Sequence, residues 1–515
     1  MSAAATSSDG HSSPSLAQKI LGETARFAAL QVVAAGLAWG ANIVLARILD
    51  RRDFGVYGIC LFYIGIGSLL GDGGLGAALL RRRREPTRKE FRIALTALLG
   101  VSAALGSVMF LAAPFIGHYN RFTPAETNVL RAMAPLYFVN AFRVVPYIRL
   151  ERALQFARIA RIELTASLVR HVLAIGLALA GGGVWSLVVA GAVSSALQLF
   201  FAYRASPGWV GIGWSWRVFR PLIGYGGKVQ ALGICSYLKD NISAALLGGA
   251  LGPAAVGVFD VGLKYIQIPV TAVNSLARVQ LPVYARLDSD DPTLYSALRG
   301  ATRTALLLGI PFLGALAFAG PWIIPLVYSP RWVPAYPVIW GLLANMIGGL
   351  VASPLFTLLQ GQGRPGLAIV VFVVWTLLTW ALAILGLVLV PGSLGFVALA
   401  HSVVTVAVVI ALVAWAGRHL GRGLFSSLVG PVIAGVVGFS GAALLPRLAG
   451  SLGTWSAHPI AQTLAAISMY FVVLLAIERR TVIDEFRTLV ASIRRKRKNV
   501  PESAGSDDAS VPRAA

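Results

Sequence analysis

The chain has 515 residues, of which 57% are hydrophobic and only 13% are charged, and its mean hydropathy is +0.74. This composition excludes an ordinary soluble protein and indicates a protein embedded in a membrane. The net charge of +23 does not indicate nucleic-acid binding, because much of it lies in short runs such as 81–84 and 494–498. Basic runs of this kind are typical of cytoplasmic loops and of segments that contact anionic lipid headgroups.

Apolar stretches of about 20 residues, the length that crosses the hydrocarbon core as a helix, recur along the chain. We predict fourteen spans, near residues 27–46, 56–80, 93–117, 128–148, 163–181, 184–203, 222–248, 254–281, 301–327, 335–360, 366–390, 394–416, 425–446 and 459–477. Most of the 44 Lys and Arg residues fall in every second gap and in both tails, which the positive-inside rule assigns to the cytoplasm. The sequence therefore predicts an all-α, multi-pass protein of the bacterial inner membrane, with both termini in the cytoplasm.

An internal repeat is visible in the loops that follow the first and the seventh span. The alignment that pairs Leu49 with Leu251 also pairs Gly55 with Gly257, and segment 121–125 resembles segment 331–335 in the same order along the chain. Each repeat contains six spans, an even number, so both repeats enter the membrane in the same orientation. Parallel repeats are related by an axis along the membrane normal, and transporters place their substrate at the interface between such repeats.

The repeat divides the chain into five segments. We expect a disordered cytoplasmic tail (1–22), a first lobe of spans one to six (23–204), a second lobe of spans seven to twelve (221–416), two further spans (425–477) and a basic, largely disordered cytoplasmic tail (478–515). The last two spans lie outside the duplication.

Several motifs resemble those of a known family. They lie at 45–49 and 53–57 (LARIL and DFGVY), at 72–77 in the second span, at 247–252 with 256–259 in the second repeat, and at 282–287 after the eighth span. Over roughly residues 25–365, the chain resembles the polysaccharide transporters, or oligosaccharide flippases, of the multidrug/oligosaccharide-lipid/polysaccharide exporter superfamily. One position departs from the family pattern, which often has Asn-x-Asp in span seven. Here the residues are Asn241-Ile242-Ser243, and the adjacent Asp240 points to another side of the helix.

The resemblance implies two six-helix lobes around a central cavity that opens alternately to the cytoplasm and the periplasm, with two extra C-terminal helices. The implied cargo is a polyprenyl-pyrophosphate-linked oligosaccharide. The protein would carry it from the cytoplasmic to the periplasmic leaflet for exopolysaccharide, capsule or lipopolysaccharide assembly. Besides this cargo and the bilayer, a polysaccharide polymerase and co-polymerase are the implied partners, and no cofactor or nucleic acid is expected.

Six polar side chains share one face of the eighth span, because they recur at steps of four, three, four, three and four residues. They are Asp260, Lys264, Gln267, Thr271, Asn274 and Arg278. Such a stripe in a membrane helix must face protein or water, so two interpretations stay open. Either the stripe lines the cavity and holds the pyrophosphate, or it forms a polar seam in which Asp260 and Lys264 simply pair at i,i+4.

Cations within the spans suit a pyrophosphate cargo, because Arg and Lys in a low-dielectric cavity bind phosphate oxygens strongly. The candidate substrate-binding residues are Arg170, Lys228, Lys239, Lys264, Gln267, Asn274 and Arg278. For Arg170 and Lys239 a buried structural pair is an equally good interpretation, and Lys228 lies near a helix end where its side chain can snorkel to the interface. The acidic candidates for coupling transport to an ion are Asp72, Glu163, Asp240 and Asp260.

The sequence contains no catalytic or metal-binding constellation. Segment 224–229 (GYGGKV) lacks the Ser or Thr that follows the Lys of a phosphate loop, and Cys60, Cys235 and the six histidines have no metal-ligand spacing. A cation-coupled multidrug exporter of the same superfamily is the alternative, although a cavity rich in Lys and Arg would repel its cationic cargo. A membrane glycosyltransferase, polymerase or ligase is less favoured, because it needs a soluble domain or a long outer loop. The longest outer gap (446–458) is short.

Overall fold

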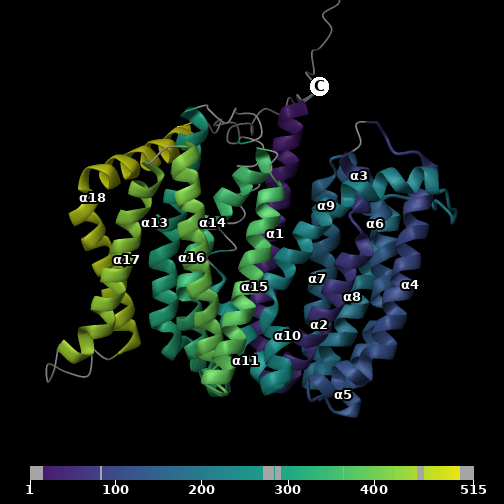
Figure 1. The fold of residues 1–515 in the computed structure, drawn as a ribbon, viewed down its shortest axis with the longest axis horizontal. Coiled ribbons are helices and arrows are strands. Elements are labelled where there is room, and N and C mark those ends of the chain that lie inside the picture. Colours follow the sequence, from purple (N-terminus) through teal and green to yellow (C-terminus); the bar gives the residue numbers. More distant parts are fainter. Residues whose placement is uncertain are drawn as a thin grey trace, which may run out of the picture.

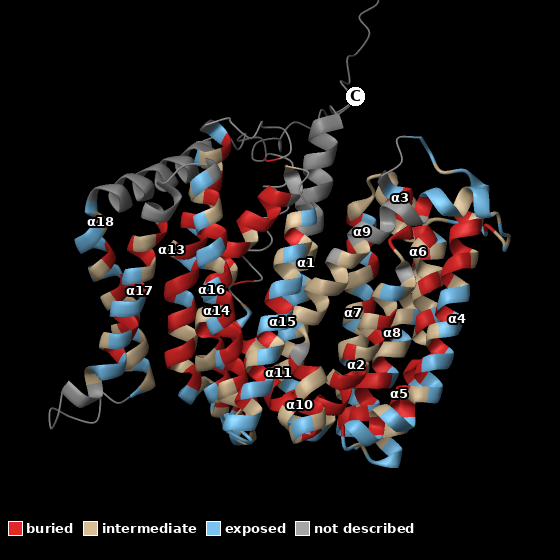
Figure 2. Ribbon diagram, viewed as in Figure 1, coloured by how far each residue is buried: buried red, intermediate tan, exposed pale blue. Residues whose placement is uncertain are grey.

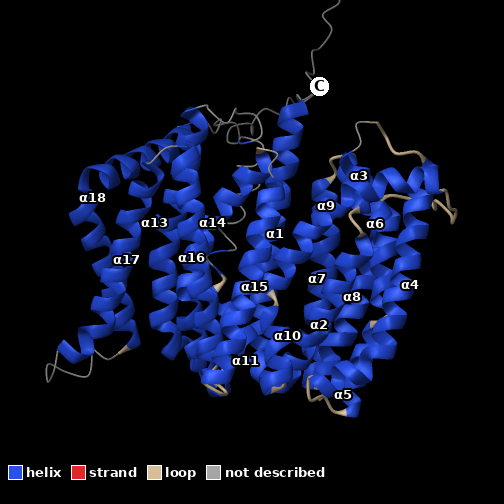
Figure 3. Ribbon diagram, in the orientation of Figure 1, coloured by secondary structure: helices blue, strands red, loops and turns tan. Residues whose placement is uncertain are grey.

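The computed structural model describes the backbone of residues 16–81, 84–268, 270, 284, 292–362, 365–420, 423–448 and 458–498. Within these ranges every regular element is a helix, and most of the helices run side by side through the molecule (Figure 1 and Figure 3). The prediction of an all-α fold is therefore confirmed.

The internal repeat divides the helices, in chain order, into two groups that are followed by a C-terminal pair. The N-terminal group consists of α1 (Leu16–Ile48), α2 (Arg51–Asp72), α3 (Leu75–Arg81), α4 (Arg88–Tyr119), α5 (Pro124–Met133), α6 (Leu136–Arg152), α7 (Phe156–Leu179) and α8 (Val184–Ala205). The C-terminal group consists of α9 (Trp216–Asp240), α10 (Ile242–Leu251), α11 (Pro253–Ile266), α13 (Pro292–Ile323), the π-helical η1 (Ile324–Tyr328), the 3₁₀-helical η2 (Pro330–Ala335), α14 (Tyr336–Gly361), α15 (Pro365–Leu389) and α16 (Leu394–Leu420). The pair α17 (Gly423–Leu448) and α18 (Pro459–Lys498) packs against α13.

By length and hydropathy, ten helices in the described ranges are able to cross a membrane. Three of the fourteen predicted spans take another form. In span one the apolar helix covers only Val33–Ile48, span four is divided between α5 and α6, and span seven is divided between α9 and α10. Residues 271–281 of span eight lie outside the described ranges, so the number of fourteen stays a prediction.

Both divided spans have a local cause. Pro135 has no backbone N–H to continue α5, and the N–H of Ala134 bonds back to the carbonyl of Arg131 (3.2 Å) in a tight turn. At Asn241 the backbone N–H and the side-chain amide both donate to the carbonyl of Tyr237 (3.0 Å each). These two hydrogen bonds to one carbonyl end α9, and they leave Asn241 with non-helical backbone angles.

Two loops carry the same helix-start signal at opposite ends of α4. Thr87 accepts a hydrogen bond from the backbone of Glu90 (3.3 Å), while the Glu90 carboxylate accepts from the backbone of Thr87 (2.8 Å). Thr123 and Glu126 form the same reciprocal pair at the start of α5 (3.3 and 2.7 Å). Such capping boxes satisfy backbone donors that the first helical turn leaves unpaired.

Large apolar side chains are exposed on the outer surface of the helix bundle, whereas several of the largest aromatic side chains are buried between helices. Leu111 and Phe115 of α4 are each 77% exposed, whereas Trp332, Tyr265 and Tyr470 are fully buried. Figure 2 shows the buried residues on the faces that the helices turn toward one another. An exposed apolar surface of this extent suits contact with lipid.

The last helix is attached to the C-terminal group at its bend. Glu478 has non-helical backbone angles (φ −130°, ψ 34°) inside α18, and its carboxylate pairs with the buried guanidinium of Arg303 in α13. Gly430 of α17 lies against the same carboxylate, where a β-carbon would not fit. The ion pair therefore joins α13 to α18, and α17 packs against it.

Helix extends beyond the predicted boundaries at both ends of the described chain. α1 begins at Leu16 and α18 continues to Lys498, where disordered tails were expected up to residue 22 and from residue 478. The start of α1 and the end of α18 lie at the same end of the molecule (Figure 1), as an even number of membrane crossings requires.

Candidate functional site

The two groups of helices meet along α9, which packs against α2, α3 and α4, and at the end of the molecule where α5, α10 and α11 lie (Figure 1). There α2 packs against α11, and Gly55 lies against Gly257. A β-carbon at position 55 would overlap the carbonyl of Pro253, and one at position 257 would overlap the carbonyl of Arg51. Only glycine permits this approach, as in other membrane helix pairs that meet through small residues.

This contact is reciprocal, as a two-fold axis requires. The repeat alignment that pairs Gly55 with Gly257 also pairs Arg51 with Pro253, and each glycine lies against the equivalent residue of the opposite helix. In a two-fold contact, residue i of the first half contacts residue j of the second half, and residue j of the first half contacts residue i of the second half. This reciprocity is what a structural duplication with an axis through the crossing of α2 and α11 predicts.

The second pair of repeated loops makes a matching pair of hydrogen bonds between the groups. Arg121 donates to the carbonyl of Ala250 (2.9 Å), and Arg331 donates to the carbonyl of Leu49 (3.1 Å). Arg331 also pairs with the exposed carboxylate of Asp50 (3.1 Å). Each arginine thus bonds to a carbonyl of the opposite group. That carbonyl lies just before the helix, α11 or α2, that carries Gly257 or Gly55.

Trp332 is a fully buried contact between the two groups of helices. Its side chain is fully buried, its Nε1 donates to the carbonyl of Ala46 (2.7 Å), and its ring meets Phe54 edge-on with the ring centroids 5.3 Å apart. Nearby, Arg47 of α1 donates to the carbonyl of Val327 (2.8 Å) in the π-helical segment η1. We call the contacts of Gly55, Gly257, Arg121, Arg331 and Trp332 the seal.

The polar stripe of span eight is described only in its first half. Lys264 Nζ pairs with Asp260 Oδ2 at 2.6 Å, and the Lys264 side chain remains 46% exposed. Gln267 is exposed at the C-terminal end of α11. Asn274 and Arg278 lie outside the described ranges. The pairing at i,i+4 is present, and the exposure of Lys264 leaves its ammonium accessible to a ligand.

Lys239 lies at the end of α9 between an acid and an aromatic ring. Its ammonium pairs with Asp240 and lies 4.8 Å from the ring centroid of Trp375 in α15. The Lys239 side chain is only 18% exposed, whereas that of Asp240 is 56% exposed. A cation held over a Trp ring is stabilised by the ring quadrupole, so Trp375 helps to hold the Lys239 ammonium between α9 and α15.

The remaining candidates lie on other helices. Arg170 of α7 donates to the hydroxyl of Tyr57 in α2 (3.1 Å), and Glu163 of α7 accepts from the side chain of Gln31 in α1 (2.7 Å). The side chains of Lys228 and Asp72 lie outside the described part of the chain. Arg170, Lys239 and Lys264, the candidate cations whose side chains are described, thus lie on three different helices, and each makes its own local contacts.

Sequence reasoning missed the residues of the seal as functional residues. From the sequence, Arg121, Trp332 and Arg331 were recognised only as members of the repeat. Their motif recurs in two loops on the same predicted side of the membrane, and this recurrence was the signal that could have identified them. Trp375 as the partner of Lys239 had no signal in the sequence. Within the described residues, no three His, Cys, Asp or Glu side chains lie close enough together to hold a metal ion.

Solved structures with the same fold include two transporters. A lipid II flippase, MurJ, in an inward closed conformation superposes with a TM-score of 0.69 at 13% identity, covering 88% of this chain and 99% of that one. An inward-facing multidrug resistance MATE family transporter superposes with a TM-score of 0.59 at 16% identity, covering 76% of this chain and 95% of that one. At these identities the likeness shows the fold alone.

Sequence comparison identifies the family. The lipopolysaccharide biosynthesis protein WzxC of Escherichia coli is 24% identical over 367 residues, 68% of this chain and 71% of the relative. The succinoglycan biosynthesis transport protein ExoT of Rhizobium meliloti is 26% identical over 338 residues, 64% of this chain and 66% of the relative. The family model described as polysaccharide biosynthesis protein matches residues 44–337. The resemblance seen in the motifs is confirmed, and the chain belongs to this family of polysaccharide biosynthesis proteins.

Proposed function

We propose that the protein is a flippase that carries a polyprenyl-pyrophosphate-linked oligosaccharide from the cytoplasmic to the periplasmic leaflet of the bacterial inner membrane. The family, a relative named for succinoglycan transport and a fold shared with a lipid II flippase support this function. The repeat unit would then serve exopolysaccharide, capsule or lipopolysaccharide assembly, with a polymerase and co-polymerase as partners. The chain acts as a transporter and not as an enzyme.

The reciprocal seal is the observation that carries this proposal. A carrier that opens alternately to two sides needs a contact that closes one side and can be broken again. The seal consists of hydrogen bonds to carbonyls and of close glycine packing, with one buried tryptophan. Each hydrogen bond of a charged donor contributes about 1.5–3 kcal/mol, so cargo binding can offset its loss. We assign the seal to the periplasmic side, because the basic loops lie at the other end.

In this mechanism the N-terminal and C-terminal groups are the two lobes, and they rock about the two-fold axis through the α2–α11 crossing. The pyrophosphate would be held by separated cations, Arg170, Lys239 and Lys264, with Lys228, Gln267, Asn274 and Arg278 completing the set. Spread cations bind a phosphate through charge-assisted hydrogen bonds but do not enclose it, which permits release. Asp72, Glu163, Asp240 and Asp260 are the candidates for ion coupling.

A cation-coupled multidrug exporter is the second candidate, because a MATE transporter shares the fold. The two functions predict different phenotypes. In a deletion strain the flippase proposal predicts that surface polysaccharide is lost while its lipid-linked repeat unit accumulates in the cytoplasmic leaflet. Normal polysaccharide together with sensitivity to cationic drugs would instead establish the exporter.

A further inference from the structure

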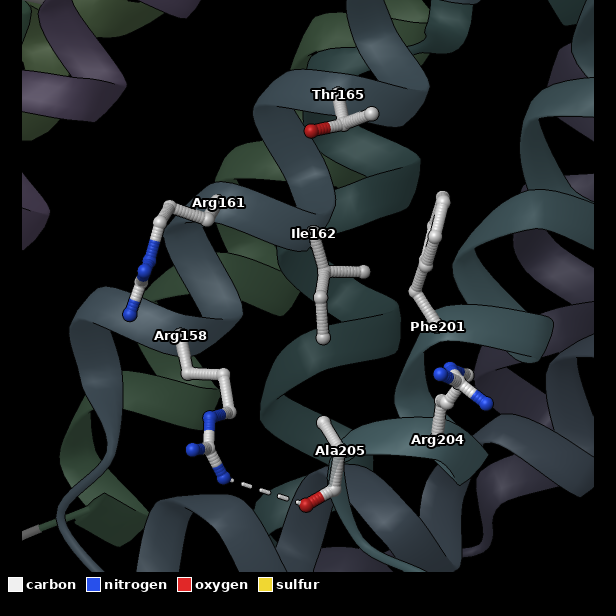
Figure 4. Close-up of a pocket in the computed structure, with 7 residues that line it drawn as sticks. All are labelled: Arg158, Arg161, Ile162, Thr165, Phe201, Arg204 and Ala205. Atoms are coloured by element: carbon white, nitrogen blue, oxygen red, sulfur yellow. Dashed lines mark hydrogen bonds between the residues drawn. The ribbon is translucent and has the colours of Figure 1, made fainter.

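A basic cavity opens on the outer side of the N-terminal group, away from the seal. It has a volume of about 440 Å³ and lies between α7 and α8. Arg158, Arg161 and Thr165 line it from α7, and Phe201 and Arg204 line it from α8 (Figure 4). Positions 158, 161 and 165 share one face of α7, because they are three and four residues apart.

The three arginines have no acidic partner in the described ranges. Arg158 donates to the side chain of Gln155 (2.8 Å) and to the carbonyl of Ala205 (3.4 Å), and Arg161 donates to the carbonyl of Ala157 (3.3 Å). None of the ion pairs among the described residues includes these arginines. Figure 4 places Arg161 and Arg204 on opposite sides of the apolar floor formed by Ile162. The cavity is therefore a cationic rim around an apolar centre, complementary to an anion.

An apolar groove continues from this cavity along the other flank of α8. It has a volume of about 330 Å³, shares Arg204 with the cavity and is otherwise lined mainly by Val139, Ala196, Leu199 and Phe200. From Arg204 to Ala196 the groove follows α8 for about 12 Å, at 1.5 Å per residue. A charged rim that leads into an apolar groove matches a lipid, with its headgroup on the rim and an acyl chain in the groove.

The arginines lie at the membrane interface. Arg158 is in the first turn of α7 and Arg204 is in the last turn of α8. The segment that follows α8 exposes three tryptophans, Trp209, Trp214 and Trp216, each more than half exposed. Exposed tryptophans and arginines at helix ends are typical of the headgroup level, and basic pockets between helices on the cytoplasmic side bind anionic headgroups.

We propose that the cavity between α7 and α8 binds an anionic phospholipid of the cytoplasmic leaflet. Its phosphate contacts Arg158, Arg161 and Arg204, and one acyl chain occupies the groove along α8. The guanidinium groups match phosphate oxygens through charge-assisted hydrogen bonds. This assignment concerns the surrounding bilayer and does not depend on which cargo the protein carries.

Native mass spectrometry of the full-length, detergent-solubilised protein tests the site, with dioleoyl phosphatidylglycerol and dioleoyl phosphatidylcholine as probes. The triple variant Arg158→Gln/Arg161→Gln/Arg204→Gln should bind phosphatidylglycerol about tenfold more weakly or worse. The control Lys89→Gln/Arg217→Gln/Arg299→Gln removes three exposed charges elsewhere on the same predicted side and should bind like wild type. Equal binding by both variants would overturn the proposal, provided that both melt at the wild-type temperature without lipid.

Two further measurements separate a lipid from a free anion and test the groove. Inorganic pyrophosphate should not displace phosphatidylglycerol at equal concentration, because it lacks the acyl chain. Complete displacement would mean that the site binds free phosphate and would overturn the lipid assignment. Ala196→Trp fills the groove and should weaken phosphatidylglycerol binding with all three arginines present. Unchanged binding in this variant would overturn the placement of the acyl chain.

Discussion

Replacement of Gly55 or Gly257 by alanine is expected to weaken the seal without unfolding the protein. The new β-carbon at position 55 would overlap the carbonyl of Pro253 and lie 3.1 Å from the backbone nitrogen of Gly257, where ordinary contacts begin at 3.4 Å. The β-carbon at position 257 would meet Arg51 and Gly55 in the same way. The helices must therefore move apart by on the order of 1 Å, and overpacking of this kind costs about 1–3 kcal/mol.

This cost falls only on the conformation in which the seal is closed, so it shifts the equilibrium between the two conformations. A difference of about 1–3 kcal/mol changes their ratio roughly 5- to 150-fold. Because the contact is two-fold, Gly55→Ala and Gly257→Ala should have effects of similar size. Transport should decrease in both variants, since each cycle must return to the closed conformation.

Oxidative cross-linking measures the closed population directly. A β-carbon at Gly58 would lie 3.8 Å from the Val256 side chain, so Gly58→Cys with Val256→Cys falls within disulfide reach. In a background without Cys60 and Cys235, the pair should cross-link rapidly, and each alanine variant should slow the reaction. Gly176→Ala is the control, because its β-carbon meets no atom within 4 Å. Unchanged rates in both variants, or a change in only one, would refute the two-fold seal.

Ion pairs elsewhere in the molecule give further expectations. Glu478→Gln removes the carboxylate that pairs with the buried guanidinium of Arg303, so thermal denaturation should report a loss of stability of about 3–5 kcal/mol; an unchanged melting temperature would contradict this. Asp260→Asn with Lys264→Gln removes two charges at similar volume, and if they contact pyrophosphate, cargo affinity should fall roughly tenfold to a hundredfold, from about 1.5–3 kcal/mol. Full transport at normal protein levels would assign this pair to a structural seam. Burial raises the pKa of Glu126, but the hydrogen bonds and charge of its neighbours outweigh burial and hold that pKa below its ordinary value. Its contribution to stability is therefore complete above about pH 4.3 and is lost as the pH falls through the lowered pKa. The Glu126→Gln variant should lose less stability than the wild type on acidification. An equal loss in both proteins would show that Glu126 does not contribute to the acid sensitivity.

Hydropathy predicted the membrane fold because an apolar stretch of about 20 residues has few alternatives in lipid. It did not predict the breaks at Pro135 and Asn241. Hydropathy is summed over a window, whereas a break depends on single hydrogen bonds, such as those that the Tyr237 carbonyl accepts from Asn241. The same limit explains why the spans four and seven were predicted as continuous helices.

The sequence predicted that the chain is duplicated, but not that the duplicated motifs touch each other. Alignment relates Gly55 to Gly257 without placing them in space, and only the folded chain shows that each lies against the other. The Asp260–Lys264 pair was predictable, because i,i+4 spacing on one helix fixes proximity. The contact of Lys239 with Trp375 was not predictable, since it joins helices far apart in the sequence.

The leaflet position of the lipid-linked repeat unit, measured with the Gly58→Cys/Val256→Cys protein as the only copy, tests the central claim most directly. With the disulfide formed, the seal cannot open, and the account predicts that the repeat unit stays in the cytoplasmic leaflet and surface polysaccharide is absent. Reduction of the disulfide should restore both within the same cells. Transport that continues at the wild-type rate in fully cross-linked protein would contradict the account, because the cargo would then cross without opening the seal.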